Sequence, residues 1–451
     1  MNPAQYLPAL ATALALVAAP GTGSVSAQSV PAPASSASAA TSVSPTDQLV
    51  RFFETRVQRD PEDYAALNRL AGLYLRRARE KDDDSDFERA KAAAQASLKA
   101  VPAETNAGAI YALTQHAQAV HDFAAARDHA RQLIELDPGK SDPFLLLGDA
   151  LLELGDYAAA EQAFDQAEQA EGNAAQPALR RARLAVLRGD LPAARDRLSR
   201  ALALIRNGSA PSPEAIAWCQ WQLGETFFAE GDYATAERHY REAVTGSPGH
   251  RASLAALARA RAAQGDLAGA IAGYETVVAS APHPEFTSRL GDLYALAGRP
   301  ADAARQYALV ENARDVPHDN RTLAVFYADQ GINSEEAYRR ALSEYKARQD
   351  IYTADALAWT AYKAGKIPEA RKAAEQALRL GTRDARILYH AGLIARAAGD
   401  EAAARDYLRR ALALNPEFDP LQAPLARKAL LATNEKGRGN RQPAQLAGDR
   451  Q

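Results

Sequence analysis

Two stretches of the chain share one pattern: GDALLELGDYAAAEQAFDQA at residues 148–167 and GETFFAEGDYATAERHYREA at residues 224–243. Each opens with a glycine, continues with a Gly-Asp pair, and places an alanine twelve residues after the first glycine. Small residues at such positions let two helices approach closely. A glycine followed by an aspartate can end one helix and cap the next. The pattern therefore predicts two helices joined by a tight turn.

The alanine of this pattern recurs along most of the chain. Successive members are separated by 36, 34, 34, 42, 34, 33, 34, 33 and 34 residues. A period of 34 residues is that of a helix–turn–helix repeat. We therefore predict an all-α, right-handed superhelical solenoid of about ten helical hairpins over residues 62–416. The recurring alanines are Ala90, Ala126, Ala160, Ala194, Ala236, Ala270, Ala303, Ala337, Ala370 and Ala404.

Composition favours helix and gives no sign of catalytic chemistry. Charged residues make up 24% of the chain and the net charge is -3, so no one-signed surface for nucleic acid is expected. The single cysteine, Cys219, cannot form an internal disulfide or a thiolate metal site, and we expect it to be buried. The histidines form no metal-binding motif, and no nucleotide-binding or hydrolase motif is present. We expect no enzyme activity, cofactor or metal.

The first 27 residues differ from the rest of the chain. An apolar run from Leu7 to Ala19 is followed by the small residues Val25-Ser26-Ala27, which is the pattern of a secretory signal peptide cleaved before Gln28, although no Lys or Arg precedes the run. Residues 28–45, rich in Ser, Ala and Pro, are predicted to be a flexible linker. We therefore expect a periplasmic or secreted protein without stable membrane insertion.

The repeats are bounded by two predicted caps and interrupted twice. Residues 46–61 and 417–433 each fit a single capping helix, as expected where a terminal repeat lacks a neighbour, and residues 434–451 are predicted to be a disordered tail. An insertion at 79–86 predicts a longer, solvated loop in the first repeat. A second insertion at 204–213 is a candidate division of the solenoid into two halves.

These markers resemble the tetratricopeptide repeat family over nearly all of the mature chain. The resemblance implies a superhelix whose first helices line a concave groove and a role as scaffold, co-chaperone or assembly factor. Leu145 and Asp149 stand where some relatives carry the Lys and Asn that bind a peptide carboxylate, so that clamp is absent. We expect a non-catalytic interaction scaffold of the bacterial envelope that binds partner peptides in the groove. The alternative is a component of an export or polysaccharide secretion machine.

Aromatic residues mark the candidate groove. All three tryptophans of the chain fall in two clusters, at positions that face the groove in this family. Aromatic anchors flanked by acids would suit a neutral or basic peptide. The competing interpretation, that these side chains pack between adjacent helices, has equal weight, and the sequence leaves the oligomeric state open. The candidate partner-binding residues are Trp218, Trp221, Glu225, Phe228, Tyr352, Asp355, Trp359 and Tyr362.

Overall fold

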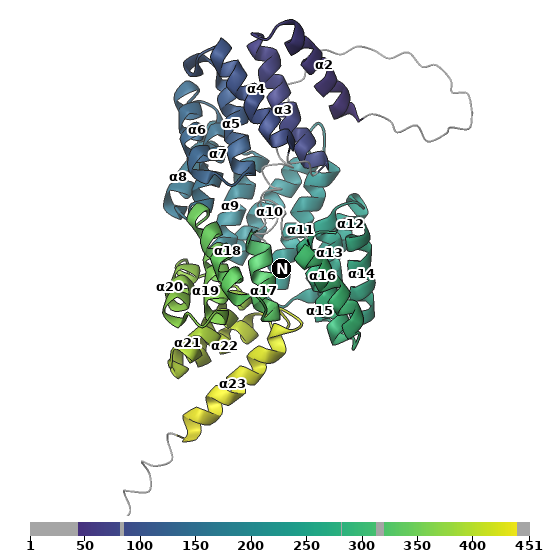
Figure 1. The fold of residues 1–451 in the computed structure, drawn as a ribbon, viewed down its shortest axis with the longest axis vertical. Helices are drawn as coiled ribbons and strands as arrows, with labels where there is room; N and C mark the ends of the chain where they lie inside the picture. The colour runs from purple at the N-terminus through teal and green to yellow at the C-terminus, as the bar shows by residue number, and fades with distance from the viewer. Residues whose placement is uncertain (1–43, 82–84, 281, 313–319, 440–451) are drawn as a thin grey trace, which may run out of the picture. The chain divides into compact units, whose positions relative to one another are not determined.

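The structure, a computed structural model, describes residues 44–81, 85–280, 282–312 and 320–439. The described residues contain helices and no strand, which confirms the predicted all-α class (Figure 1). They form two compact units: an N-terminal unit that ends at Leu147 and a C-terminal unit that begins at Gly148. The predicted signal peptide, and the linker up to residue 43, lie outside the described residues.

The N-terminal unit begins with a lone helix and continues with paired ones. Helix α7 crosses the division between the units, so only its first half belongs here. Helix α3 is longer than the other first helices because the insertion expected as a loop extends it to Lys81; residues 82–84 lie outside the described residues. The helices are α2 (Pro45–Arg59), α3 (Tyr64–Lys81), α4 (Ser85–Ala100), α5 (Ala107–Ala119), α6 (Phe123–Leu136) and α7 (Ser141–Glu153), with a short 3-10 helix, η2 (Ala103–Thr105).

The C-terminal unit continues the same alternation of a first helix, helix A, and a second, helix B. Counting from α3–α4 to α21–α22, the described residues form ten such hairpins, as the period predicted. The helices are α8 (Tyr157–Glu171), α9 (Ala175–Leu187), α10 (Leu191–Arg206), α11 (Pro213–Ala229), α12 (Tyr233–Gly246), α13 (Arg251–Ala263), α14 (Leu267–Ser280), α15 (Pro284–Leu296), α16 (Pro300–Asn312), α17 (Asn320–Gln330), α18 (Ser334–Ala347), α19 (Ile351–Lys363), α20 (Ile367–Leu378), α21 (Ala385–Ala397), α22 (Glu401–Leu414) and α23 (Gln422–Gly439).

The Gly-Asp turns do what the sequence predicted. Gly155 has a φ of 75°, a left-handed conformation that glycine adopts without strain, and it ends α7. The Asp156 side chain then accepts a hydrogen bond from the Ala159 N–H at the start of α8. The same arrangement recurs at Gly189-Asp190 and Gly231-Asp232. Each turn thus ends one helix and begins the next within two residues.

In four hairpins a glycine on helix A lies under a large residue on helix B. A Cβ atom added to Gly148 would lie 2.2 Å from the Phe164 ring, and one added to Gly224 would lie 2.4 Å from the Tyr240 ring. The large residue therefore fills the space above the glycine of its own hairpin. The ten recurring alanines are all buried, with at most 3% of their surface exposed.

The boundaries differ from the sequence prediction in two places. The loop between α10 and α11, where a division of the solenoid was considered, lies inside the C-terminal unit, and these two helices contact each other. The units instead divide between Leu147 and Gly148. At the other end, α23 continues to Gly439, so residues 434–439 of the expected tail are helical. Residues 440–451 lie outside the described part of the chain.

Candidate functional site

The predicted partner-binding residues all lie on two A helices of the C-terminal unit, α11 and α19. Trp218, Trp221 and Trp359 have 4%, 1% and 3% of their surface exposed. Phe228 and Tyr352 are also buried, and Tyr362 is half-buried. Side chains this enclosed are not available to a partner in this conformation. Their burial favours the packing interpretation over that of groove anchors.

The α11 cluster is fully engaged within the fold. Trp221 meets Trp218 edge to face, at 6.4 Å between ring centroids. The Arg259 guanidinium lies 3.8 Å from the centre of the Phe228 ring and 2.5 Å from the Glu225 carboxylate. Glu225 also accepts a hydrogen bond from the Tyr240 hydroxyl at 2.7 Å. The acid expected to attract a basic peptide is therefore already paired with a buried arginine.

The α19 cluster is equally occupied. Trp359 stacks on His390 at 4.1 Å and donates its indole N–H to Asp329 at 2.8 Å. Asp355 contacts Nδ1 of His390 at 3.0 Å, and Tyr362 also stacks on Trp359. A tryptophan that is stacked and hydrogen-bonded in this way is held as part of a core.

The two clusters approach each other at one point. Glu225 and Phe228 from α11, with Tyr352 and Asp355 from α19, line a cavity of about 60 Å³. Ligand pockets are typically several hundred Å³, whereas this volume suits a few water molecules. The structure therefore brings half of the predicted site together, but around a space too small for a peptide.

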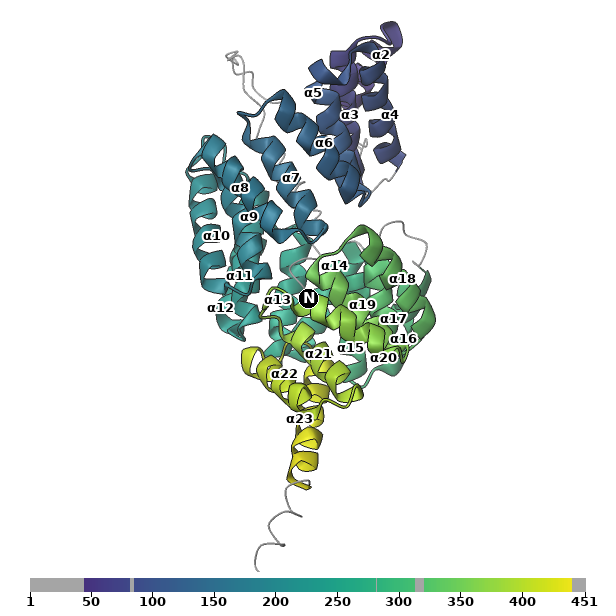
Figure 2. The same ribbon diagram turned by 90° about the vertical axis from the view of Figure 1, so that its left-hand side faces the viewer.

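Trp221 and Trp359 are covered by neighbouring hairpins, through His250 and His390. The C-terminal unit also closes on itself beside Phe228 and Tyr352, along a contact that we call the seam. The turns of three successive hairpins, at Gly155–Tyr157, Gly189–Leu191 and Gly231–Tyr233, meet the loops that precede α19, α21 and α23 (Figures 1 and 2). Each turn contacts the loop six hairpins further along the chain. Two edges of the unit are thus joined by a regular series of contacts.

The first seam contact is made by backbone and a buried tyrosine. The Gln349 N–H donates to the Glu153 carbonyl at 2.7 Å, and the Ile351 N–H donates to the Tyr157 hydroxyl at 2.9 Å. Arg379 donates to the Gly155 carbonyl at 3.1 Å. Burial raises the pKa of Tyr157 to about 12, so its hydroxyl remains protonated at neutral pH.

The second and third seam contacts follow the same geometry. A Cβ atom at Gly189 would lie 2.8 Å from the Arg383 backbone nitrogen, so only glycine allows this approach. At the third contact the Tyr233 hydroxyl donates to the Asn415 side chain at 2.6 Å. It also accepts from the Glu417 N–H at 2.9 Å. The Asn415 amide donates to the Phe228 carbonyl at 2.7 Å, which links the segment before α23 to α11.

A buried ion cluster lies beside the first seam contact. The Glu153 carboxylate lies 2.5 Å from both Arg183 and Arg348, and Arg348 is 3.0 Å from Asp350. Burial alone would raise the pKa of Glu153, but Arg348 and Arg183 outweigh it and lower the pKa to about 2. Removing one member would leave a buried charge unpaired, which is costly.

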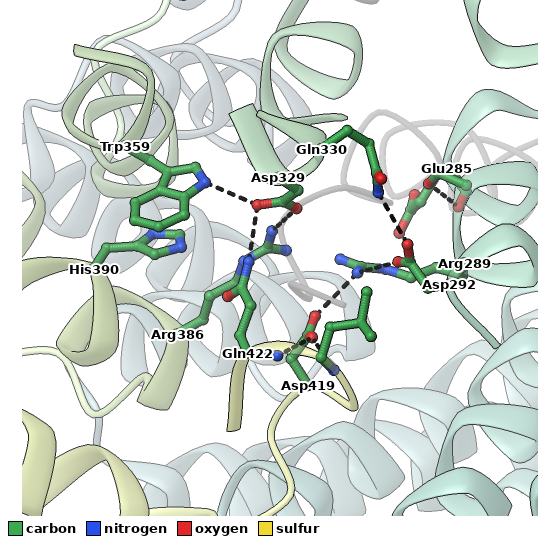
Figure 3. Close-up of polar contacts among 12 residues, drawn as sticks. Glu285, Arg289, Asp292, Asp329, Gln330, Trp359, Arg386, His390, Asp419 and Gln422 are labelled. Atoms are coloured by element: carbon green, nitrogen blue, oxygen red, sulfur yellow. Dashed lines mark hydrogen bonds and ion pairs between the residues drawn. The ribbon is translucent and has the colours of Figure 1, made fainter. Parts of the chain in front are cut away.

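A second polar network fills the interior of the unit (Figure 3). Arg289 on α15 contacts Asp292 at 3.2 Å and Asp419 at 3.0 Å. Asp329 on α17 accepts hydrogen bonds from Arg386 at 2.6 Å and from the Gln422 amide at 2.8 Å. The network thus links three A helices to the segment around α23.

The pKa values of the two acids that contact Arg289 are shifted in opposite directions. Burial raises the pKa of Asp292 to about 6 although Arg289 opposes it. The pKa of Asp419 falls to about 2 because Arg289 and Arg386 outweigh burial. Arg289 and Arg386 are thus both paired with acids of the fold.

The N-terminal unit keeps a different A-helix surface. On α3, Arg69, Gly72 and Arg76 are exposed and Arg79 is partly exposed, while Tyr111 on α5 is half-buried. The two helices are adjacent here, because a Cβ added to Gly108 on α5 would lie 2.6 Å from the Asn68 side chain on α3. The α3–α5 surface, as we call it, comprises Ala65, Asn68, Arg69, Gly72, Arg76, Arg79, Gly108, Tyr111 and Gln115.

Other chemistry has little support in the described part of the chain. No group of three or more His, Cys, Asp or Glu side chains there is placed to hold a metal ion. Cys219 is buried, and burial raises the pKa of its thiol to about 12, so it stays protonated. Among the described helices, none combines the length and hydrophobicity required to span a bilayer.

Comparison with known families decides the identity of the repeat. Three family models, each described as a tetratricopeptide repeat, match residues 173–248, residues 227–288, and residues 111–176 with 356–417. The chain belongs to the tetratricopeptide repeat family. Tetratricopeptide repeats are typically non-catalytic modules that bind other proteins. No curated protein matches this tetratricopeptide-repeat chain.

Solved structures show distant likeness to this tetratricopeptide-repeat protein. A human IFIT1 dimer with PPP-AAAA is 17% identical, over 74% of this chain and 77% of that chain, with a TM-score of 0.49. PilW, a type IV pilus biogenesis factor, is 18% identical over 48% and 96% of the two chains, with a TM-score of 0.38. A tetratricopeptide repeat protein from Parabacteroides merdae is 18% identical over 58% and 100%, with a TM-score of 0.32. None of these transfers a ligand or partner to this chain.

Sequence reasoning missed the seam of this tetratricopeptide-repeat protein. Tyr157 and Tyr233 both follow a Gly-Asp turn, which is visible in the sequence. Their partners Ile351 and Asn415 lie 194 and 182 residues away. A 34-residue period reports contacts between neighbouring hairpins only, so it carries no signal for this closure.

Proposed function

We propose that this protein is a non-catalytic scaffold or assembly factor of the bacterial envelope that binds segments of partner proteins on an A-helix surface. The supporting observation is the contrast between the units. In the C-terminal unit the candidate groove residues are buried behind the seam, whereas the α3–α5 surface is exposed. An exposed A-helix surface on a protein-binding repeat suits a role in holding a partner.

The envelope location rests on the sequence of residues 1–27. N-terminal sequencing of the exported protein should begin at Gln28. Recovery of intact Met1 on a cytoplasmic protein would overturn the location and leave the scaffold proposal standing.

The scaffold proposal is tested by co-purification with the tagged full-length protein, followed by reciprocal purification from each recovered partner. We expect the same envelope proteins in both directions, at a constant ratio to the bait. Recovery indistinguishable from that of the tag alone, in both directions, contradicts the proposal.

The aromatic clusters of α11 and α19 contribute to this function only if the seam opens. Opening would uncover Phe228 and Tyr352, because the seam contacts border the cavity that they line. Partner recovery that depends on Trp221 and Trp359, without a change in stability, would place the binding site in the two clusters.

A further inference from the structure

The charge of the α3–α5 surface differs from the balanced charge of the whole chain. Helix α5 contains neither Asp nor Glu, and Glu80 is the single acid of α3. Against it, α3 presents Arg69, Arg76 and Arg79 along one face. The surface is therefore basic although the chain carries a net charge of -3.

The arginines of this face are available to a ligand. Arg69 is exposed and makes no ion pair within the described residues. Arg76 pairs with Glu80 at 2.7 Å, but both side chains are more than a third exposed, so this pair contributes little stability and can exchange. Arg77, in contrast, donates two hydrogen bonds to the carboxylate of buried Asp86 and is not available to a ligand.

Arg79 is the most buried of the three arginines on this face. Its Nε–H donates to the Leu75 carbonyl at 2.9 Å, and no carboxylate within the described residues pairs with its guanidinium. Burial lowers the pKa of Arg79 below its ordinary value, and the neighbouring Arg76 lowers it further, although Tyr111 and Glu80 act in the opposite direction. A carboxylate supplied by a ligand would relieve this cost and gain a charge-assisted hydrogen bond.

The helix surface between these arginines, which we call the floor, carries no side chain at Gly72. Gly72 lies between Arg69 and Arg76 on α3, and a Cβ atom added there would meet no atom within 4 Å. From Ala65 to Arg79 the face rises for roughly 21 Å at 1.5 Å per residue, which is the span of about six extended residues. A backbone can approach closely over the glycine while its side chains reach the arginines.

We propose that the α3–α5 surface binds an extended acidic segment of a partner protein, with Arg69, Arg76 and Arg79 pairing its carboxylates over the floor at Gly72. This inference deepens the proposed scaffold function and rests on it. It differs from the sequence expectation of a neutral or basic peptide, because that expectation came from the acids of α11 and α19, which are paired within the fold.

The test uses the full-length protein and two fluorescent probes, hexaglutamate and hexaglutamine. Hexaglutamate should bind, and hexaglutamine should bind at least about tenfold more weakly. Raising the ionic strength from about 0.05 M to about 0.5 M should weaken the binding of hexaglutamate. Arg69→Glu and Arg79→Gln should each lower hexaglutamate affinity about tenfold or more. Arg131→Glu, an exposed arginine on α6, is the charge control and should change little.

A second variant separates binding from folding. Gly72→Gln places a side chain on the floor at a position where a Cβ atom meets no other atom within 4 Å. It also replaces a helical glycine with a better helix former, so we expect the fold to be retained. It should abolish most hexaglutamate binding, while Gly246→Gln, at an equally open glycine at the end of α12, should not.

Equal binding of the two probes overturns the inference, as does an effect of Arg131→Glu that matches that of Arg69→Glu. If partner proteins are still recovered with Arg69→Glu and Gly72→Gln at the level of the unaltered chain, the acidic-segment inference fails and the scaffold function stands. If the unaltered chain recovers no partner above the level of the tag alone, the scaffold function itself is contradicted.

Discussion

The two units are built from the same repeat but treat their A helices differently. In the C-terminal unit, α11 and α19 bury tryptophans behind a seam that joins residues as far apart in the chain as Tyr157 and Ile351. In the N-terminal unit, α3 presents arginines and a bare glycine to solvent. The difference shows that a repeat position which faces the groove within one hairpin can become core when neighbouring hairpins pack over it, as at Trp221 and Trp359. Position in the repeat alone does not identify a binding residue.

The largest expected effect concerns the buried tryptophans. Trp221→Ala and Trp359→Ala should each destabilise the C-terminal unit by about 3–5 kcal/mol, because a large cavity replaces a packed ring. Urea unfolding of the full-length protein measures this, with Tyr64→Ala, at a side chain 44% exposed, as the control. An unchanged unfolding midpoint with lost partner recovery would restore the groove interpretation.

The next largest effect concerns how the stability of the C-terminal unit depends on pH. Asp292 has a pKa of about 6 in the folded protein against an ordinary value of 3.8, so the folded state binds its proton more tightly. The contribution of Asp292 to stability therefore rises as pH falls from above 6 toward 4, by at most about 3 kcal/mol. His250, whose pKa burial lowers to about 4, acts in the opposite direction over this range, so the effect is read from the difference between the variant and the unaltered chain. Asp292→Asn, which mimics the protonated acid, should remove that rise in urea unfolding measured at several pH values.

Two other acids of the same unit act in the opposite direction. Glu153 and Asp419 have pKa values lowered to about 2, so their contribution is present above their ordinary values of 4.5 and 3.8 and is lost as pH falls toward 2. A difference in stability between Asp292→Asn and the unaltered chain that stays constant between about pH 6 and 4 would show that Asp292 does not titrate in this range.

Turn glycines provide a finer comparison within one unit. Gly155 and Gly189 touch the seam, whereas a Cβ atom added to Gly265 or Gly399 would meet no atom within 4 Å, and all four have φ between 73° and 87°. Alanine costs about 1–2 kcal/mol at each because of the left-handed backbone. At the seam positions we expect a further loss of about 1–3 kcal/mol from overpacking. Equal losses at the four positions in urea unfolding would contradict the seam.

The sequence was sufficient for the repeat and its local geometry. The buried alanines, the left-handed turn glycines and the aspartate caps follow from spacing and from the conformational freedom of glycine, which act within one hairpin. For Trp221 and Trp359 the sequence left two interpretations open, because the same A-helix position can face the groove or pack against the next hairpin. The seam could not be predicted, because it joins turns and loops six hairpins apart. The role of Arg79 was hidden for a similar reason: the insertion that lengthens α3 looks like a loop in the sequence.

The closure of the C-terminal unit is tested most directly by a double-mutant cycle across the seam. Tyr233→Phe and Asn415→Ala remove the two partners of one hydrogen bond, 2.6 Å long, between residues 182 positions apart. The free energies of unfolding of both single variants and the double variant give a coupling energy. We predict a coupling of about 1 kcal/mol, the net value of such a hydrogen bond. Strict additivity, within about 0.3 kcal/mol, would mean that the two residues do not meet and that the unit is an open superhelix.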